Sequence, residues 1–240
     1  MNIAVVIAAA LLPAVLLWIY VWKKDTQKEP AKLLLKAVLW GMALCIPVAF
    51  FEAGVIEVFF HGAQEPNNIG EAITQAFVVA ALPEEAFKLL ALWLILRKNP
   101  YFDEHYDGIV YAVSVGLGFA AVENIFYVIS SGDWLFVAIS RALLAVPGHY
   151  AFAVLMGYFY SMHHFVDHSK RTAACILLVP VIAHGIYDSI AFSGALDAEV
   201  GGICSLILII FCVRLHKFAR KKMTAQIQRD MGVFDESFQA

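Results

Sequence analysis

The sequence of 240 residues has little charge: Asp, Glu, Lys and Arg make up 15% of it, whereas hydrophobic residues make up 61%. A soluble domain carries about a quarter charged residues, so water is not the main solvent of this chain. The formal net charge of −3 carries little information, because the placement of charges matters more than their sum in a membrane protein. No nucleic-acid partner is expected.

Cysteine is also scarce, and none of the four cysteines has the short paired spacing of a zinc or redox site. All four lie inside apolar runs, which is typical of small buried or lipid-facing residues. The first apolar run, residues 3–22, lacks the preceding basic residues and the small-residue cleavage site of a signal peptide. We therefore expect it to be retained as a first membrane span.

Long apolar runs recur along the whole chain, and each is long enough to cross about 30 Å of hydrocarbon as a helix. They predict an all-α, polytopic transmembrane helix bundle of about seven spans. The expected spans are 3–22, 33–60, 71–97, 108–131, 134–162, 171–193 and 200–219.

The basic residues support this count, because they cluster in alternate connections. Lysine and arginine flank the first, third and fifth connections and follow the last span, while the second, fourth and sixth connections contain none. Cytoplasmic loops carry the excess of Lys and Arg. The pattern predicts an N-terminus outside and a C-terminus in the cytoplasm, in a multi-pass protein of the cell membrane (the plasma or inner membrane).

The connections are short, so we expect a single transmembrane domain over residues 1–220 with its catalytic core at about 71–193. Residues 221–240 are polar and are expected to form a short cytoplasmic tail.

Several ionisable residues fall within the expected spans. On insertion scales each charged group costs roughly 2.5–3.5 kcal/mol at the bilayer centre, so six of them facing lipid would cost on the order of 15 kcal/mol. A fold stable by about 5–15 kcal/mol could not absorb this. Counted along their helices they reach similar depths, so we expect them to face one another inside the bundle. They are Glu84, Glu85, Lys88, Glu123, Arg141, His149, His184 and Asp188.

Helical spacing sorts this set. Glu84 and Glu85 precede Lys88 by four and three residues, so either carboxylate can pair with the lysine. We expect one glutamate to be held by Lys88 while the other faces a cavity. His184 and Asp188 are also four residues apart, which allows the carboxylate to orient the imidazole.

Other polar residues carry weaker signals. Taken alone, His149 is a satisfied core histidine, Glu123 is a helix-packing residue after the close-approach stretch 116–118, and Arg141 extends toward the outer interface. Proline stands shortly before Glu84, His149 and His184, and each frees a carbonyl one turn upstream. We assign no role to Glu52, which lies at the outer end of its span.

Together the motifs resemble a known family. Glu84-Glu85-x-x-Lys88, Phe119-x-x-x-Glu123-Asn124, His149 and His184-x-x-x-Asp188, in this order in four successive spans, are similar to those of the PrsW-like intramembrane proteases. That family shares a superfamily with the CaaX-processing prenyl proteases and with bacteriocin-immunity-type membrane proteins. The resemblance covers spans three to six, about half of the chain.

The resemblance implies an α-helical bundle that hydrolyses a peptide bond of a membrane-anchored protein, with anti-sigma factors as a substrate type cut at the first site. It implies that Glu84 or Glu85 activates a water and that His184 with Asp188 binds the water or stabilises the oxyanion. The wider superfamily often has histidine where this chain has Glu123, and we expect His149 to supply the missing imidazole.

The chemistry leaves the catalytic type open between two readings. A carboxylate in low dielectric suits a general base, and a cofactor-free glutamate mechanism ranks first. Histidine and carboxylate are also ordinary zinc ligands, but no H-E-x-x-H helix is present, so a zinc mechanism ranks second.

Two further functions fit the buried charges. A proton- or ion-coupled transporter uses the same residue types, although no inverted repeats are visible. A non-catalytic binding or immunity-type membrane protein would keep the cluster for stability.

Overall fold

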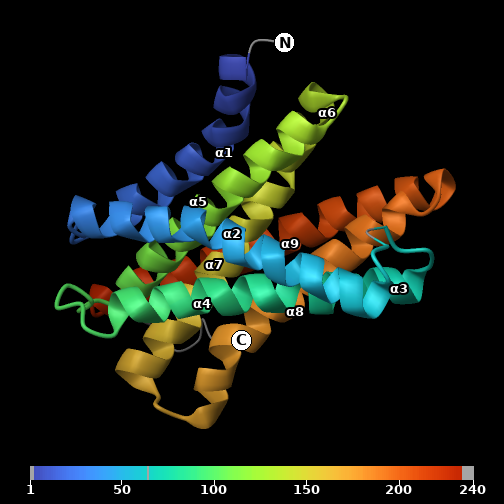
Figure 1. The fold of residues 1–240 in the computed structure, drawn as a ribbon. Helices are drawn as coiled ribbons and strands as arrows, with labels where there is room; N and C mark the ends of the chain where they lie inside the picture. The colour runs from blue at the N-terminus through green and yellow to red at the C-terminus, as the bar shows by residue number, and fades with distance from the viewer. Residues whose placement is uncertain (1–2, 64, 234–240) are drawn as a thin grey trace.

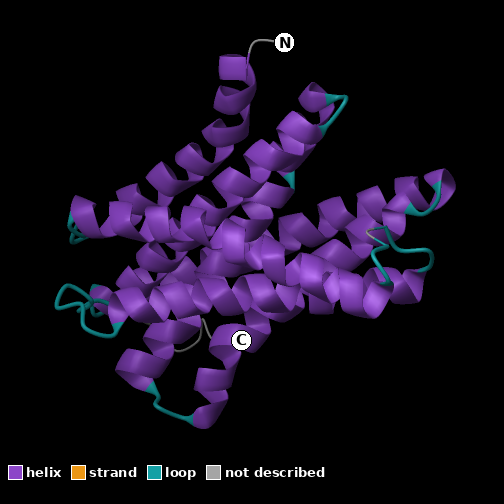
Figure 2. Ribbon diagram, viewed as in Figure 1, coloured by secondary structure: helices purple, strands orange, loops and turns teal. Residues whose placement is uncertain are grey.

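The computed structural model describes residues 3–63 and 65–233, and all regular elements in this part of the chain are helices (Figures 1 and 2). Two short π-helices, η1 and η2, interrupt the α-helices. The elements are α1 (Ile3–Lys24), α2 (Ala31–Phe60), α3 (Ile69–Thr74), η1 (Gln75–Ala81), α4 (Leu82–Leu96), α5 (Asp107–Ser130), α6 (Trp134–Leu143), α7 (Ala145–Ser161), η2 (Met162–Val166), α8 (Lys170–Ala195) and α9 (Ala198–Asp230).

Six helical stretches are long and apolar enough to cross a membrane, so the chain is a multi-pass α-helical membrane protein: Ile3–Lys24, Ala31–Phe60, Asp107–Ser130, Trp134–Val166, Lys170–Ala195 and Glu199–Asp230. The remaining expected span, 71–97, corresponds to α3, η1 and α4. These follow one another without a loop from Ile69 to Leu96 but differ in helix type. A total of seven spans and the orientation of the termini stay predictions.

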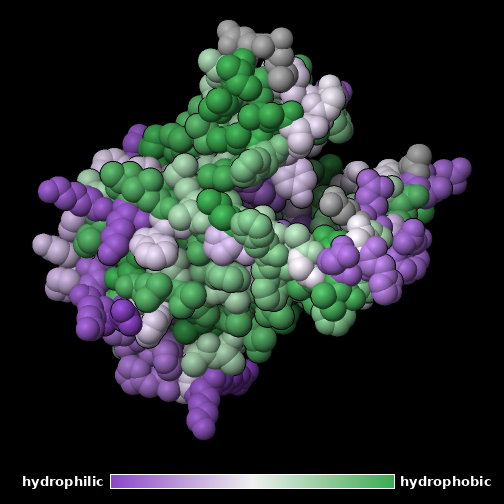
Figure 3. Space-filling view, viewed as in Figure 1, coloured by the Kyte–Doolittle hydropathy of each residue, from purple (hydrophilic) through white to green (hydrophobic). Residues whose placement is uncertain are grey.

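The surface agrees with a bilayer environment. Figure 3 shows hydrophobic side chains over the middle of the molecule and hydrophilic ones gathered near its ends. Large apolar side chains such as Phe50, Phe59 and Leu143 are about 70% exposed, which in water would be costly at this density. Lipid is the solvent that this surface fits.

Helix α5 is the centre of the bundle and is buried along most of its length. Glycines allow its backbone to approach its neighbours closely: a Cβ at Gly118 would lie 2.3 Å from the carbonyl oxygen of Val38 in α2, and one at Gly41 would lie 2.0 Å from that of Val115. Such contacts require glycine. The predicted close approach at residues 116–118 is confirmed.

The π-helix η1 ends at Ala81, two residues before Pro83. Because proline has no N–H, one hydrogen bond of a regular α-helical ladder is missing at this position. The chain instead widens by one residue, and the N–H of Leu82 donates to the carbonyl of Phe77, five residues back. Turns of this kind are common at functional sites, and here the turn directly precedes Glu84 and Glu85.

The span expected over 134–162 is present as Trp134–Val166, and within it the chain breaks at Leu144 between α6 and α7. Pro147 is the physical reason: its missing N–H leaves the carbonyl of Leu143 without its helical partner and its ring crowds that oxygen. The third proline of the set, Pro180, lies inside α8 without ending it.

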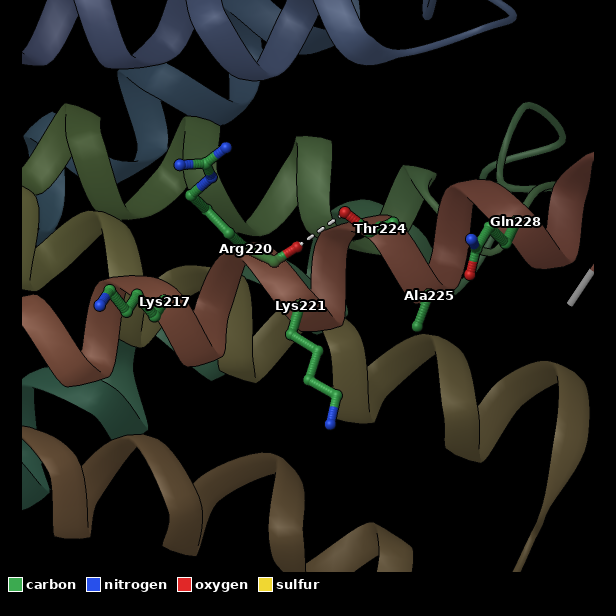
Figure 4. Close-up of a pocket in the computed structure, with 6 residues that line it drawn as sticks. All are labelled: Lys217, Arg220, Lys221, Thr224, Ala225 and Gln228. Carbon is green, nitrogen blue, oxygen red and sulfur yellow. Dashed lines mark hydrogen bonds between the residues drawn. The ribbon is translucent and has the colours of Figure 1, made fainter. Parts of the chain in front are cut away.

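Helix α9 continues well past the expected membrane boundary at residue 219 and ends at Asp230. Met223 and Gln226 are buried in this extension, so residues 221–230 pack against the bundle as helix; residues 234–240 lie outside the described part. A shallow pocket of about 340 Å³ is lined by residues of this part of α9 (Figure 4). Its lining includes Lys217, Arg220 and Lys221.

Candidate active site

Helix α4 brings two carboxylates to one lysine. Glu84 and Glu85 lie in its first turn and Lys88 in the next. The Nζ atom of Lys88 is 2.9 Å from Glu84 Oε2 and 2.9 Å from Glu85 Oε1. The expectation that the lysine would hold only one of them is wrong, because three and four residues are both in reach on a helix and an ammonium has three protons to donate.

Helix α8 adds an imidazole between two acids. His184 Nδ1 lies 3.0 Å from Glu85 Oε1, and His184 Nε2 lies 3.1 Å from Asp188 Oδ2. An ionised carboxylate only accepts hydrogen bonds. With both acids ionised, both ring nitrogens must carry a proton, so this geometry holds His184 as an imidazolium. The predicted i,i+4 contact with Asp188 is present.

His149 of α7 joins the α4 group to α5. Its Nε2 lies 2.8 Å from Glu123 Oε2, and its Nδ1 lies 3.4 Å from Lys88 Nζ. The ammonium can only donate, so Nδ1 accepts from it and Nε2–H donates to Glu123. His149 is therefore a neutral imidazole with a defined tautomer.

Sequence reasoning missed the contribution of Arg141. Its Nη2 lies 2.8 Å from Glu123 Oε2 and its Nε lies 2.8 Å from Asn124 Oδ1, so it points into the bundle and not to the outer interface. Asn124 in turn donates to the carbonyl of Ala10 in α1. The charge of Glu123 was the sequence signal for this contact. A carboxylate inside a span needs a permanently charged partner, and a histidine does not carry a permanent charge.

Glu52 of α2, to which we assigned no role, lies within electrostatic range of Glu84, Glu123 and Asp188. Within the described residues no hydrogen bond joins it to the others. It is a neighbour of the network without being a member.

Aromatic rings surround the charged groups of this network. Lys88 Nζ is 4.3 Å from the ring centre of Phe119, and the ring of Phe152 stacks on that of His184 at 4.7 Å. The first contact explains the Phe-x-x-x-Glu spacing: in α5, Phe119 covers the lysine and Glu123, one turn on, binds His149. Aromatic faces keep water away from most of the charged atoms and so strengthen their interactions.

The structure thus brings all seven predicted site residues into one network: Glu84, Glu85, Lys88, Glu123, His149, His184 and Asp188. They come from four helices, α4, α5, α7 and α8, which pack against one another in the centre of the molecule (Figure 1). Exposure of the side chains rises from 1% at Glu85 to 13% at Asp188 and 21% at Glu123. The open side of the network is therefore the side of Glu123 and Asp188.

The same residues offer a metal-ligand set. Glu84, His149 and His184 each present one ligand atom, and these atoms lie within 4.8 Å of one another in a buried position. Two imidazoles and a carboxylate are an ordinary set for zinc. The residues present therefore fit such an ion, although His184 would have to give up a proton and one of its two carboxylate contacts to bind it.

Comparison with known proteins decides the family. Residues 29–215 match the model of the family described as "PrsW family intramembrane metalloprotease". This chain belongs to the PrsW family. Relatives called Protease PrsW are 33% identical in Oceanobacillus iheyensis, over 77% of this chain and 82% of the relative, and 34% identical in Bacillus subtilis, with the same coverage. One from Clostridioides difficile is 31% identical over 94% of this chain and 92% of its own.

No solved structure matches the chain. The PrsW assignment makes the protein an intramembrane protease that acts on a membrane protein within a lipid bilayer, as the motifs predicted. The transporter and the non-catalytic readings are therefore set aside. The PrsW assignment leaves the role of each residue, and the catalytic type, to be argued from the geometry.

Proposed function

We propose that this PrsW-family protein is a glutamic-type endopeptidase of the cell membrane, in which Glu84 activates the water that cuts a membrane-anchored substrate. The observation that carries this proposal is the shared lysine: Glu84 and Glu85 both contact Lys88, while only Glu85 contacts His184. The two glutamates thus have different partners and can have different tasks.

Glu84 is the better candidate for the base. Glu85 is almost completely buried, and its Oε1 already binds both Lys88 and His184. Glu84 is slightly more exposed, 7% against 1%, and only its Oε2 binds the lysine. A general base must reach the proton that it abstracts, and one carboxylate oxygen of Glu84 lies within 4.8 Å of a ring nitrogen of both His149 and His184.

The proposed reaction uses the residues of the network and exchanges one hydrogen bond of His184. Glu84 takes a proton from a water molecule as the hydroxyl oxygen attacks the carbonyl carbon of the scissile bond. Imidazolium His184 then turns its Nε2–H from Asp188 to the oxygen that becomes negative, a contribution worth several kcal/mol in a water-poor site. The proton on Glu84 then passes to the leaving amine as the C–N bond breaks, which restores the carboxylate.

Lys88 and Asp188 position these groups. The ammonium of Lys88 lies 2.9 Å from both adjacent carboxylates and offsets their mutual repulsion. Asp188 holds the imidazolium against Glu85. Glu123, fixed by Arg141, sets the tautomer of His149 so that its Nδ1 faces Lys88.

A zinc mechanism is the second candidate, favoured by the triad of Glu84, His149 and His184. When bound there, the metal would polarise the scissile carbonyl and lower the pKa of a bound water. In that case Glu84 would serve as a ligand, and Glu85 with its free Oε2 would be the remaining carboxylate able to accept a proton.

The substrate class follows from the resemblance and from depth. The PrsW-like motifs imply a single-pass anchored protein of the anti-sigma type cut at the first site. The predicted orientation places the open side of the network toward the outer half of the bilayer, so we propose cleavage there.

The test uses purified protein in detergent with single-pass substrates, with and without chelator, and mass spectrometry to locate new termini. We expect cleavage that resists chelator, and a loss of at least about 100-fold for Glu84→Gln. For Glu85→Gln we expect a loss of similar size with a lower melting temperature, since that carboxylate also holds His184.

Glu57→Gln, an exposed glutamate on α2, is the matched control and should cleave normally. Loss of activity in chelator with recovery on adding zinc would replace the glutamic mechanism with the metal one. Full activity in Glu84→Gln, Glu85→Gln and His184→Ala together would refute the site.

A further inference from the structure

A second acidic cluster lies at another end of the bundle, outside the membrane network. Asp25 follows α1, Glu104 lies in the connection between α4 and α5, and Asp107 begins α5. One carboxylate oxygen from each lies within 4.8 Å of the other two. Both connections are at the left edge of Figure 1 and carry the basic residues that predict the cytoplasmic side.

Two of these acids are buried with an oxygen to spare. Asp25 is 4% exposed and Asp107 is not exposed at all. Their Oδ2 atoms accept main-chain N–H groups, from Glu29 for Asp25 and from Asp103 and Glu104 for Asp107. Their Oδ1 atoms are buried and have no hydrogen-bond partner in the described part of the chain. A buried acceptor without a partner is costly and rare.

The surroundings increase the negative charge. Glu29, also buried, accepts a hydrogen bond from Tyr111 and approaches Asp107. Lys28 directs its ammonium to the main-chain carbonyl oxygens of Trp22 and Asp25.

We propose that Asp25, Glu104 and Asp107 bind a hard divalent cation, with Ca²⁺ fitting the spacing and Glu29 available as a further ligand. Oxygen-only ligand sets select Ca²⁺ or Mg²⁺ over zinc. Ligand oxygens on one Ca²⁺ lie at most about 4.8 Å apart, twice a metal–oxygen distance of about 2.4 Å. The three oxygens already meet this limit.

A cation here would join three parts of the chain. Asp25 belongs to the α1–α2 connection, and Glu104 to the α4–α5 connection, while Asp107 is the first residue of α5. Helix α5 also carries Glu123 of the membrane network. The cation would therefore fix the start of the central helix to both neighbouring connections.

The competing explanation is a proton shared among the carboxylates. It predicts no response to Ca²⁺, whereas a cation site predicts stabilisation by mass action. Thermal unfolding of the purified full-length protein in detergent distinguishes the two, because it does not depend on cleavage or on the proposed role of Glu84. The probes are about 1 mM Ca²⁺, the same concentration of Mg²⁺, and EDTA.

We expect Ca²⁺ to raise the Tm by at least about 4 °C over EDTA. Asp25→Asn and Glu104→Gln should each lose this response. In EDTA both variants should melt at or above the wild-type temperature, because an amide removes like-charge repulsion. The direction of this change in Tm distinguishes a variant that has lost a cation ligand from one that no longer folds.

Two matched variants complete the test. Glu57→Gln and Glu84→Gln should keep the full Ca²⁺ response, since neither residue belongs to this cluster. A larger shift with Mg²⁺ than with Ca²⁺ supports the site and assigns it to Mg²⁺. No shift with either ion, or an undiminished shift in Asp25→Asn, overturns the proposal.

Discussion

At the scale of single residues, the membrane network is held together by charged pairs. Removing one member of such a pair leaves the other buried without its partner. Glu123 accepts from both Arg141 and His149, and removing the arginine would leave a largely buried carboxylate with only a neutral imidazole. Breaking a buried pair from one side costs more than removing both partners. The pair is therefore open to a double-mutant test.

For Arg141→Met we expect a loss of about 1–3 kcal/mol of stability, reduced from the value for a fully buried pair because Glu123 is partly exposed. Combining it with Glu123→Gln should restore part of this loss. Thermal unfolding of the two single variants and the double variant measures the coupling. Arg97→Met, at the exposed end of α4, serves as the control, and additive losses in the double variant would contradict the pairing.

Most residues of the network were predictable because charge inside a bilayer is expensive and helical spacing says which groups share a face. Lys88 with its glutamates and His184 with Asp188 follow from spacing alone. Arg141 did not, because spacing within its own span does not show that it reaches Glu123 and Asn124 on α5. The different roles proposed for Glu84 and Glu85 also required the structure, since the contact that distinguishes them, Glu85 with His184, joins α4 to α8.

At the scale of helices, hydropathy was sufficient to locate α1, α2, α5 and α8 to within a few residues. It could not show the π-helix η1 or the break between α6 and α7, because hydropathy reports how apolar a segment is and not which carbonyl each N–H reaches. The prolines at 83 and 147 marked both places. Hydropathy also failed to predict the extension of α9 to Asp230, for another reason. Only a narrow face of this extension is buried, and the rest of its sequence is polar.

Close helix packing gives a prediction at this scale. Gly41→Ala would place a Cβ 2.0 Å from the carbonyl oxygen of Val115, so α2 and α5 must move apart. We expect a loss of about 1–3 kcal/mol, measured as a lower Tm in detergent. Gly54→Ala on the same helix meets nothing within 4 Å and should be neutral or gain up to about 1 kcal/mol. Equal effects would show that this contact is unimportant.

At the scale of the whole molecule, the alternation of basic connections predicts the topology. In a variant without native cysteines, Gly132→Cys should react with an impermeant maleimide added to intact cells, and His168→Cys should react only after lysis. Both positions are exposed in connections between spans. A fluorescent protein fused to the C-terminus should mature in the cytoplasm. Labelling of His168→Cys in intact cells would reverse the predicted orientation.

The side chains of the network are not equally exposed, and this difference makes the activity depend on the surrounding lipid. Hydrolysis consumes water, and the least covered side is that of Glu123 and Asp188, which the predicted topology places toward the outer leaflet. Longer acyl chains would draw this entrance deeper into hydrocarbon. The turnover rate should then fall because less water reaches the network, while substrate affinity is unchanged. Bilayer thickness itself would then control the rate of proteolysis.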